Sequence, residues 1–341
     1  MSEKVVDQRV VDQVERDKWK RTLHTLAKDW RLYVLLVPML VFLILLKYRP
    51  IGGILLGFKW DGDPRSLLST EWAGLRWAID LFGNGQYAQQ FWTAFRNTFV
   101  NSMYGLIFGF PIPIILALLF SEIKNQAYRS ILQVCCYLPH FVSVVVVTTL
   151  LTMWCQQPDT IRTGGGVIYQ LLVSLGALEK GKDVLMVPRF FRPIYQISGV
   201  WEGSGYGSIV YFAAVMAISP TSYEAARIDG ASKLQQIKYV TFPGMAPTLT
   251  IMLIMRIGQI LNVGYEKVIL LIGNKETAWE TGEVISSWVY TMSGKNPDNP
   301  KTGEGLVQYG IVADLFNSVI AMCLVLGANA ISRRVSSTSL F

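Results

Sequence analysis

Six long apolar stretches constrain this chain more than any other feature of its sequence. They fall at about residues 30–50, 93–120, 131–155, 194–218, 247–272 and 307–331. A helix needs about 20 mostly apolar residues to cross a membrane, and backbone polar groups inside lipid are satisfied only in helices or closed barrels. Composition agrees, because hydrophobic residues make up 51% of the chain and charged residues 16%. The sequence predicts an all-α polytopic membrane protein, with about six transmembrane helices over residues 32–331.

The polar segments outside these stretches predict how the chain is oriented. Residues 1–31 are basic and polar, and no small-residue cleavage site follows the first apolar stretch, so we expect a cytoplasmic tail and not a signal peptide. Six crossings return the chain to the same side. The C-terminal tail, residues 332–341, and the polar loop at residues 219–246 are therefore expected in the cytoplasm too. The expected location is the inner or plasma membrane.

Several classes of function are disfavoured by the residues present. The net charge of +7 is explained by basic residues in cytoplasmic segments, so nucleic acid is not an expected partner. The four cysteines lie in or beside apolar stretches without Cys-x-x-Cys spacing, which predicts small buried side chains and no metal site: Cys135, Cys136, Cys155 and Cys323. The sequence has no Gly-x-x-x-x-Gly-Lys-Ser/Thr motif, so ATP hydrolysis by that route belongs to another chain. We expect a chain that is not an enzyme and binds no cofactor.

Glycine, proline and polar residues interrupt three of the apolar stretches. Gly105 and Gly109 stand four residues apart in the second stretch, a spacing that allows close packing of helices. Pro139 lies in the middle of the third. The fourth contains the segment Trp201–Gly207, whose glycines and carboxylate are tolerated at membrane depth only where they face protein or a water-filled cavity.

The polar loop between the fourth and fifth stretches has the pattern of two short helices joined by a bend. Thr221 and Glu224 have the spacing of a capping box, which predicts a helix start. Gly230, which has no Cβ, is expected at the bend. Pro243 is expected to end the second helix, and Pro247 to begin the next membrane helix. Nothing in the loop covers the apolar stripe of these helices, so either a partner protein or the lipid headgroups would cover it.

The loop also carries a longer pattern: Glu-Ala-Ala, three residues, Gly, nine residues, an aliphatic residue, one residue, an apolar residue and Pro. This pattern resembles the cytoplasmic coupling motif of importer-type permeases of the ATP-binding cassette (ABC) superfamily. Val240 and Phe242 depart mildly from it, and both remain apolar. The resemblance implies the type I ABC importer permease fold. It also implies that the following residues meet an ATPase: Glu224, Ala225, Ala226, Asp229, Gly230 and Pro243.

Further segments resemble the polysaccharide and oligosaccharide branch of these sugar permeases. They are Arg192–Tyr195, Ser198–Trp201, Arg256–Gly258 and Val263–Lys267. The implied partners are a second homologous permease forming a heterodimer, two ATPase subunits that hold ATP and Mg²⁺, an extracytoplasmic solute-binding protein and the membrane lipid. The implied substrate is an oligosaccharide, and acidic ones such as alginate or pectin fragments fall within the range of this branch. The alternative is an ion-coupled secondary transporter of a small polar solute, which would more often show two similar halves.

Polar and aromatic residues of the fourth and fifth stretches are the candidate substrate pathway. Sugars are bound by planar hydrogen-bonding groups and aromatic faces, and the candidates are Trp201, Glu202, Tyr206, Tyr211, Arg256, Gln259, Asn262 and Tyr265. Arg256, Gln259 and Asn262 follow one another at spacings of three, which predicts that they share a helical face. Two interpretations remain open: a polar wall of a channel, or a pair between Arg256 and a carboxylate such as Glu202. Arg256, with Arg96 on the second stretch, would favour an acidic sugar.

Overall fold

The computed structural model describes residues 25, 28–61, 63, 68–159, 164–273, 275–294 and 306–335. The expected tails at residues 1–31 and 332–341 therefore lie largely outside the described residues. In the described ranges the chain folds into helices joined by loops, which confirms the all-α class. The one extended contact among them is an isolated antiparallel bridge between Lys59 and Trp72.

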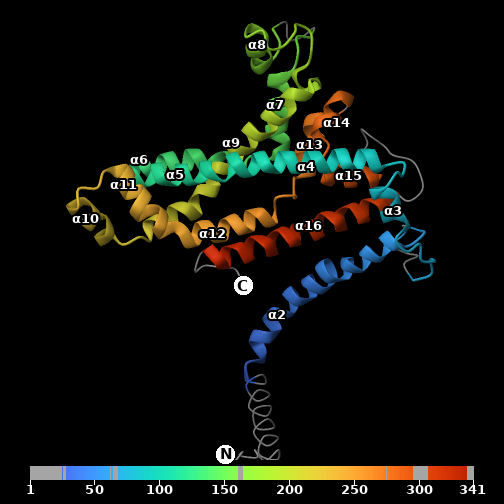
Figure 1. Ribbon diagram of the computed structural model, residues 1–341, viewed down its shortest axis with the longest axis horizontal. Coiled ribbons are helices and arrows are strands. Elements are labelled where there is room, and N and C mark those ends of the chain that lie inside the picture. Colours follow the sequence, from blue (N-terminus) through green and yellow to red (C-terminus); the bar gives the residue numbers. More distant parts are fainter. Residues whose placement is uncertain are drawn as a thin grey trace, which may run out of the picture.

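Long helices form the body of the molecule (Figure 1). In chain order they are α2 (Trp30–Leu43), α4 (Ala88–Gly109), α5 (Pro111–Glu122), α6 (Gln126–Tyr137), α7 (Val144–Cys155), α9 (Pro188–Met216), α12 (Phe242–Gly258) and α16 (Leu306–Val335). Shorter helices join them: α3 (Arg76–Phe82), α8 (Val167–Ser174), α10 (Pro220–Ile228), α11 (Lys233–Gln236), α13 (Tyr265–Ile272), α14 (Glu276–Gly282) and α15 (Ile285–Met292).

Four described helical segments are long and apolar enough to cross a membrane. They are Trp30–Phe58, Ala88–Glu122, Lys233–Gly258 and Leu306–Arg334, and the bent pair α6–α7 makes a fifth if it counts as one span. The expected fourth span forms helix α9. Its 29 residues reach about 43 Å at 1.5 Å per residue, enough to cross, but its glycines and polar residues make it less apolar than the others.

Two expected spans are broken where the sequence predicted continuous helices. In the third, Pro139 enters a tight 3₁₀ turn and Ser143 then caps α7 by accepting the N–H of Val145, so the two halves meet at 90°. In the fifth, α12 ends at Gly258 and α13 begins at Tyr265, leaving residues 259–264 irregular. Residues of the second break line a cavity, whereas residues 138–143 of the first lie at or near the surface of the described chain.

At its other end the fifth span is longer than expected. Pro243 does not end a helix, because helical structure runs unbroken from Lys233 to Gly258. A single π-helical turn at Ile237–Thr241 comes just before the proline. Because the wider π turn already departs from the i→i−4 bonding pattern, it accommodates a residue that lacks the N–H.

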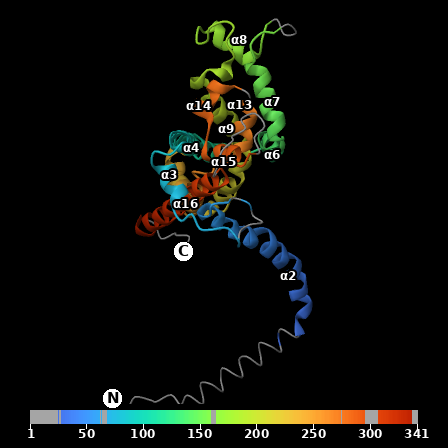
Figure 2. The ribbon, with the colours of Figure 1, turned by 90° about the vertical axis from the view of Figure 1, so that its right-hand side faces the viewer.

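Helix α9 lies at the centre of the body and packs against α4, α5, α6, α12 and α14. Its first residue follows a small lobe that contains α8, and its last precedes α10 (Figures 1 and 2). The lobe and the polar loop therefore lie at opposite ends of α9. The lobe has its own core, which includes Cys155, Tyr169 and Leu185.

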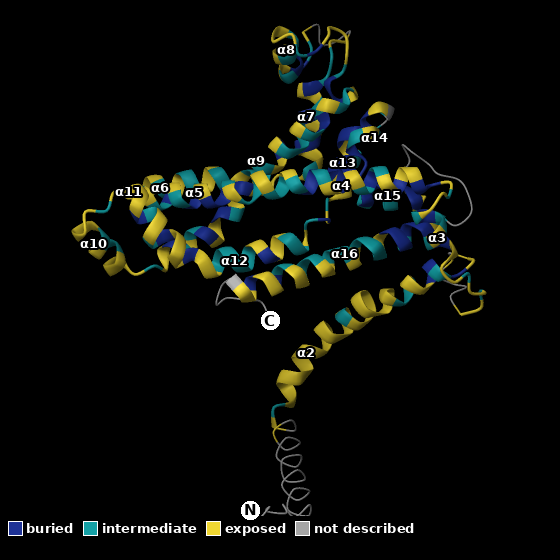
Figure 3. Ribbon diagram, viewed as in Figure 1, coloured by how far each residue is buried: buried dark blue, intermediate teal, exposed yellow. Residues whose placement is uncertain are grey.

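Helix α2 contrasts with α9 because none of its residues is buried (Figure 3). It leaves the body in both views (Figures 1 and 2). Apolar helix faces turned away from the body require lipid or another subunit around them.

The cysteines also differ from the expectation: only Cys155 is buried, Cys136 is half-buried, and Cys135 and Cys323 are exposed.

Candidate functional site

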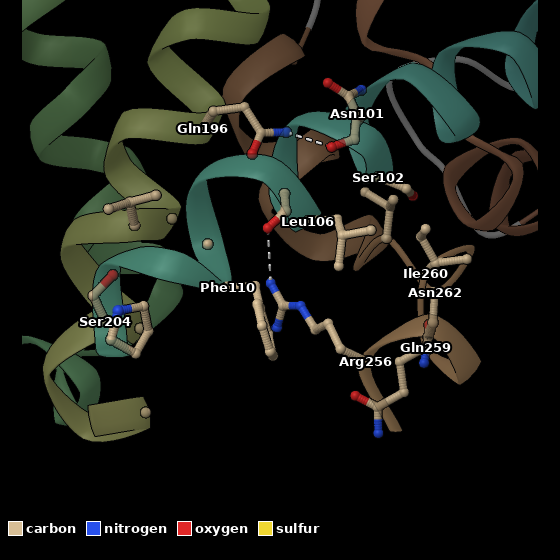
Figure 4. Close-up of a pocket in the computed structure, with 18 of the residues that line it drawn as sticks. Asn101, Ser102, Leu106, Phe110, Gln196, Ser204, Arg256, Gln259, Ile260 and Asn262 are labelled. Atoms are coloured by element: carbon tan, nitrogen blue, oxygen red, sulfur yellow. Dashed lines mark hydrogen bonds between the residues drawn. The ribbon is translucent and has the colours of Figure 1, made fainter. Parts of the chain in front are cut away.

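A cavity of about 480 Å³ opens between α4, α9 and the break that follows α12 (Figure 4). Glycines supply much of its space, because a missing Cβ lets the helices frame an opening. Those that line it are Gly105, Gly109, Gly199, Gly203, Gly207 and Gly264. Its polar side chains are Asn101, Ser102, Gln196, Glu202, Ser204, Arg256, Gln259, Asn262 and Lys267.

Arg256 enters this cavity from the last turn of α12 (Figure 4). Its Nη2 donates a hydrogen bond to the carbonyl oxygen of Gly105 at 3.4 Å. A Cβ on Gly109 would lie 3.0 Å from the same nitrogen, so this glycine leaves room for the guanidinium. The glycine pair predicted to bring helices together thus also accommodates an arginine. No carboxylate pairs with Arg256 among the described residues.

Glu202 pairs with Lys267 and not with Arg256. The Lys267 Nζ lies 2.6 Å from the Glu202 Oε2, and the two side chains are 10% and 21% exposed, respectively. The pair joins α9 to α13. Lys267 also lies 5.5 Å from the centre of the Tyr195 ring, where the ring face adds a weak attraction. Of the two interpretations left open by the sequence, a pair between Arg256 and Glu202 is therefore wrong, and Arg256 lies in the cavity without a carboxylate partner among the described residues.

Gln259 and Asn262 line the cavity, but not as neighbours on one helical face. The N–H of Gln259 is shared between the carbonyls of Met255 and Arg256, both at 3.2 Å, and the helix ends there. The N–H of Asn262 then bonds to the carbonyl of Gln259 at 2.9 Å, forming a tight turn. The predicted common face is wrong because the helix stops before the pattern is complete. The turn nevertheless leaves both amide side chains in the cavity (Figure 4).

Several polar atoms on the cavity wall are buried without a hydrogen-bond partner in the described part of the chain. They are both side-chain atoms of Asn101 and the hydroxyls of Ser102 and Ser204. The Asn101 carbonyl, by contrast, accepts from the Gln196 Nε2 at 2.8 Å (Figure 4). Buried polar groups are normally paired, so these unpaired atoms mark an unusually polar interior beside the cavity, although they are not themselves open to it. Sequence reasoning missed these residues, although polar side chains inside an apolar stretch were a usable signal.

The remaining candidates split between the cavity and other surfaces. Tyr211 is buried and lines the cavity. Trp201 is 54% exposed and does not line it. Tyr206 stacks on His140 with ring centres 4.1 Å apart, and Tyr265 stacks on Tyr290 at 4.9 Å. Five of the eight candidates therefore meet in the cavity: Glu202, Tyr211, Arg256, Gln259 and Asn262.

The polar loop has the bend that its sequence predicts but a different cap. Gly230 has a φ of +75°, the left-handed region that favours glycine, and a Cβ there would meet nothing within 4 Å. Thr221 lies inside α10 and does not cap it. The capping box belongs to the second helix, where Ser232 and Gln235 bond reciprocally at 2.7 and 3.4 Å. Local sequence preference placed the bend correctly and the cap one helix too early.

Most of the residues expected to meet an ATPase lie at the surface. Glu224, Ala225, Asp229, Gly230 and Pro243 are exposed, and Ala226 is half-buried. Apolar side chains beside them are uncovered too: Ile228 is 86% exposed, Leu234 78% and Tyr239 66%. A pair between Lys233 and Glu122 at 2.6 Å holds the loop to α5, and within the loop the Tyr223 hydroxyl lies 3.0 Å from that of Thr241.

A family model described as "Binding-protein-dependent transport system inner membrane component" matches residues 109–336. The chain belongs to this family. The match spans α5 to the end of α16, and with them the polar loop and most of the cavity lining, except the part that α4 supplies. The expected resemblance to ABC sugar permeases is confirmed, and this permease is a transport subunit and not an enzyme.

Named relatives of the permease extend the comparison over nearly its whole length. The polygalacturonan/rhamnogalacturonan transport system permease protein YteP of Bacillus subtilis is 32% identical over 96% of this chain and 95% of its own. Protein LplB of the same organism is 31% identical over 96% of this chain and 92% of its own.

The permease is also similar to a chain in a solved structure, that of a bacterial ABC transporter involved in the import of the acidic polysaccharide alginate. The TM-score is 0.78, with 35% identity over 93% of this chain and 100% of the other. A second structure shows the bacterial alginate ABC transporter in complex with an alginate pentasaccharide-bound periplasmic protein, at the same TM-score and 34% identity over 94% of this chain and 100% of that one. At this identity both the fold and the transport role are shared, which sets aside the secondary-transporter alternative.

Proposed function

We propose that this permease forms half of the membrane pathway of an ATP-driven importer for an acidic oligosaccharide. The observation that carries the proposal is the Arg256 guanidinium, which has no carboxylate partner in the described chain and lies in a cavity lined by amide side chains. A relative that transports polygalacturonan and rhamnogalacturonan, and a neighbour that imports alginate, support a uronate-containing substrate.

Charge arrangement in the cavity supports an anionic substrate. Of the two cations that line it, Lys267 is neutralised by Glu202, whereas Arg256 has no carboxylate partner among the described residues. A planar guanidinium binds a carboxylate through two parallel hydrogen bonds, which gives direction as well as affinity. Gln259, Asn262 and Asn101 can donate to and accept from sugar hydroxyls around it. Tyr211 adds an aromatic edge.

The partners follow from the two ends of the molecule. An extracytoplasmic binding protein delivers the sugar at the end that carries the α8 lobe, and a second permease completes the pathway. Two ATPase subunits, which hold ATP and Mg²⁺, contact α10 and α11 at the other end. Their contact covers Ile228 and Leu234, while Glu224 meets a basic side chain. Both termini and this loop then face the cytoplasm, and the complex lies in the inner or plasma membrane.

The test is uptake by the importer reconstituted with its own partner subunits. In Arg256→Gln, uptake of a uronate oligosaccharide should fall about 10- to 100-fold, as expected for a lost hydrogen bond to a charged group. Uptake of the same sugar with its carboxyls reduced to alcohols should change little. Arg96, which the sequence suggested as a second cation for the sugar, is exposed and does not line the cavity, so Arg96→Gln is the matched control.

Two results would contradict the proposal. An equal loss for the uronate and its reduced form in Arg256→Gln would remove the role of charge. Uptake that continues without ATP under an ion gradient would remove the importer mechanism.

A further inference from the structure

A second hollow, an apolar groove of about 530 Å³, lies on another face of the α4–α9 pair. On α4 it is lined by Tyr104 and Phe108, whereas the cavity is lined by Gly105 and Gly109. Successive residues on a helix are about 100° apart, so the two hollows lie on different sides of α4. The groove is therefore distinct from the proposed sugar pathway, although Gln196 and Val200 of α9 line both hollows.

The groove changes character along its length. At the end nearest the α8 lobe its lining is polar, with Arg189 and Arg192 in the first turns of α9. Towards the loop end its lining is apolar, with Ile197 and Val200 on α9 facing the Tyr104–Phe108 pair on α4. Ile197 is 71% exposed, so this apolar section is open to the surroundings. The groove therefore has a polar end, at the two arginines, and an open apolar section, the trough, whose lining suits an acyl chain.

The two arginines at the polar end have no carboxylate partner among the described residues. Arg192 donates through Nη2 to the Asn97 Oδ1 at 2.8 Å, but its Nε is buried without a partner in the described chain. Arg189 donates to the carbonyl of Ala177 and lies 4.7 Å from the centre of the Phe190 ring. Both contacts are to neutral groups, and Glu179, the carboxylate that lies near Arg189, is already paired with Lys182, so the arginines leave a net positive charge at the edge of a membrane helix pair. An anion is the chemistry that completes this site.

We propose that the groove binds an anionic membrane phospholipid, with its phosphate at Arg189 and Arg192 and one acyl chain along Ile197, Val200 and Phe108. Basic pockets between membrane helices bind lipid headgroups in this way. The order of polarity along the groove matches that of a lipid whose headgroup lies at the interface and whose chain lies in the hydrocarbon core. An apolar helix of the second permease would fill the trough but leave both charges unpaired. The lipid places a phosphate at the arginines and an acyl chain against the apolar side chains.

The test reconstitutes the complete importer into nanodiscs of mixed phosphatidylglycerol and phosphatidylcholine. The complex is then released from the nanodiscs, and the lipid that it retains is identified and counted by native mass spectrometry. The unmodified complex should retain phosphatidylglycerol in preference to phosphatidylcholine. Ile197→Trp, which fills the trough, and Arg189→Gln, which removes one cation, should each lower that retention about tenfold. The controls are Ile107→Trp, an exposed α4 position that does not line the groove, and Lys180→Gln, an exposed lobe cation; both should retain lipid as before.

Three outcomes would overturn the proposal. One is equal retention of the two lipids by the unmodified complex, and another is unchanged retention in both groove variants. The third is a crosslink to protein: a photoreactive residue at position 197 should capture lipid, and capture of the second permease in its place would show that a protein fills the trough. Sugar uptake need not be measured, so the outcome is independent of the proposed substrate.

Discussion

The polar loop and the cavity are built by opposite means. In the loop, α10 buries no residue, and the bend at Gly230 has open space around it, so its shape follows from backbone preference. In the cavity, the arrangement depends on contacts between distant parts of the chain, such as Glu202 with Lys267, 65 residues apart. A surface that docks another protein keeps its shape without a core, whereas a site inside a helical body takes its shape from its neighbours.

The largest effect should come from the helix packing that supports the cavity. A Cβ at Gly205 would lie 1.9 Å from the carbonyl oxygen of Cys136, which is backbone and cannot move aside. Gly205→Ala should therefore cost about 3 kcal/mol or more and lower the yield and melting temperature of the purified complex. Gly203, two residues away, has nothing within 4 Å of its Cβ position, so Gly203→Ala should be tolerated. Equal stability of the two variants would contradict this packing.

The buried pair should give the next largest effect. Lys267→Met leaves Glu202 charged and unpaired, which should destabilise the complex by about 3 kcal/mol, the lower end for a broken buried pair because the Glu202 side chain is still 21% exposed. Adding Glu202→Gln removes the remaining charge and should recover most of that loss. A double-mutant cycle on thermal unfolding measures the coupling. If the two losses simply add, the pair does not tie α9 to α13.

A change at the bend should affect coupling more than stability. Gly230→Val places a β-branched residue at a φ of +75°, at a cost of about 1–2 kcal/mol. We expect ATP hydrolysis to continue while uptake falls, with membrane insertion unchanged. Gly230→Asn is the matched control, because Asn adopts this conformation more readily. Measuring ATPase and uptake on the same vesicles separates the two, and normal uptake by the valine variant would refute the bend.

The smallest effect tests which residue caps the loop. Ser232→Ala removes the side chain that accepts from the Gln235 N–H and should cost about 1 kcal/mol. Thr221→Ala should cost less, because Thr221 makes no cap bond to the backbone of α10. Hydrogen exchange at the amides of α10 and α11 would compare the two. Greater opening in the Thr221 variant would restore the cap predicted from sequence.

The sequence predicted what local rules control. Apolar length predicted the membrane helices, and the missing Cβ of Gly230 predicted the bend. The suggested pairing of Glu202 with Arg256 was wrong, because spacing along one helix does not say which distant residue lies opposite; the partner is Lys267. The helix break after Gly258 had a signal in Gly258 and Gly264, but the apolar run outweighed it. The unpaired Asn101 lay in a stretch interpreted only as a span.

The helical run from Lys233 to Gly258 is one continuous element that joins the polar loop to the cavity. Its 26 residues reach about 39 Å, with α11 at one tip and Arg256 near the other. The run contains a π turn, Pro243 and Pro247 but no break, so in the proposed coupling a displacement of α11 passes along one helix to the guanidinium that bonds to Gly105. In the proposed importer, ATP hydrolysis and the movement of the bound sugar would be linked through this one length of backbone.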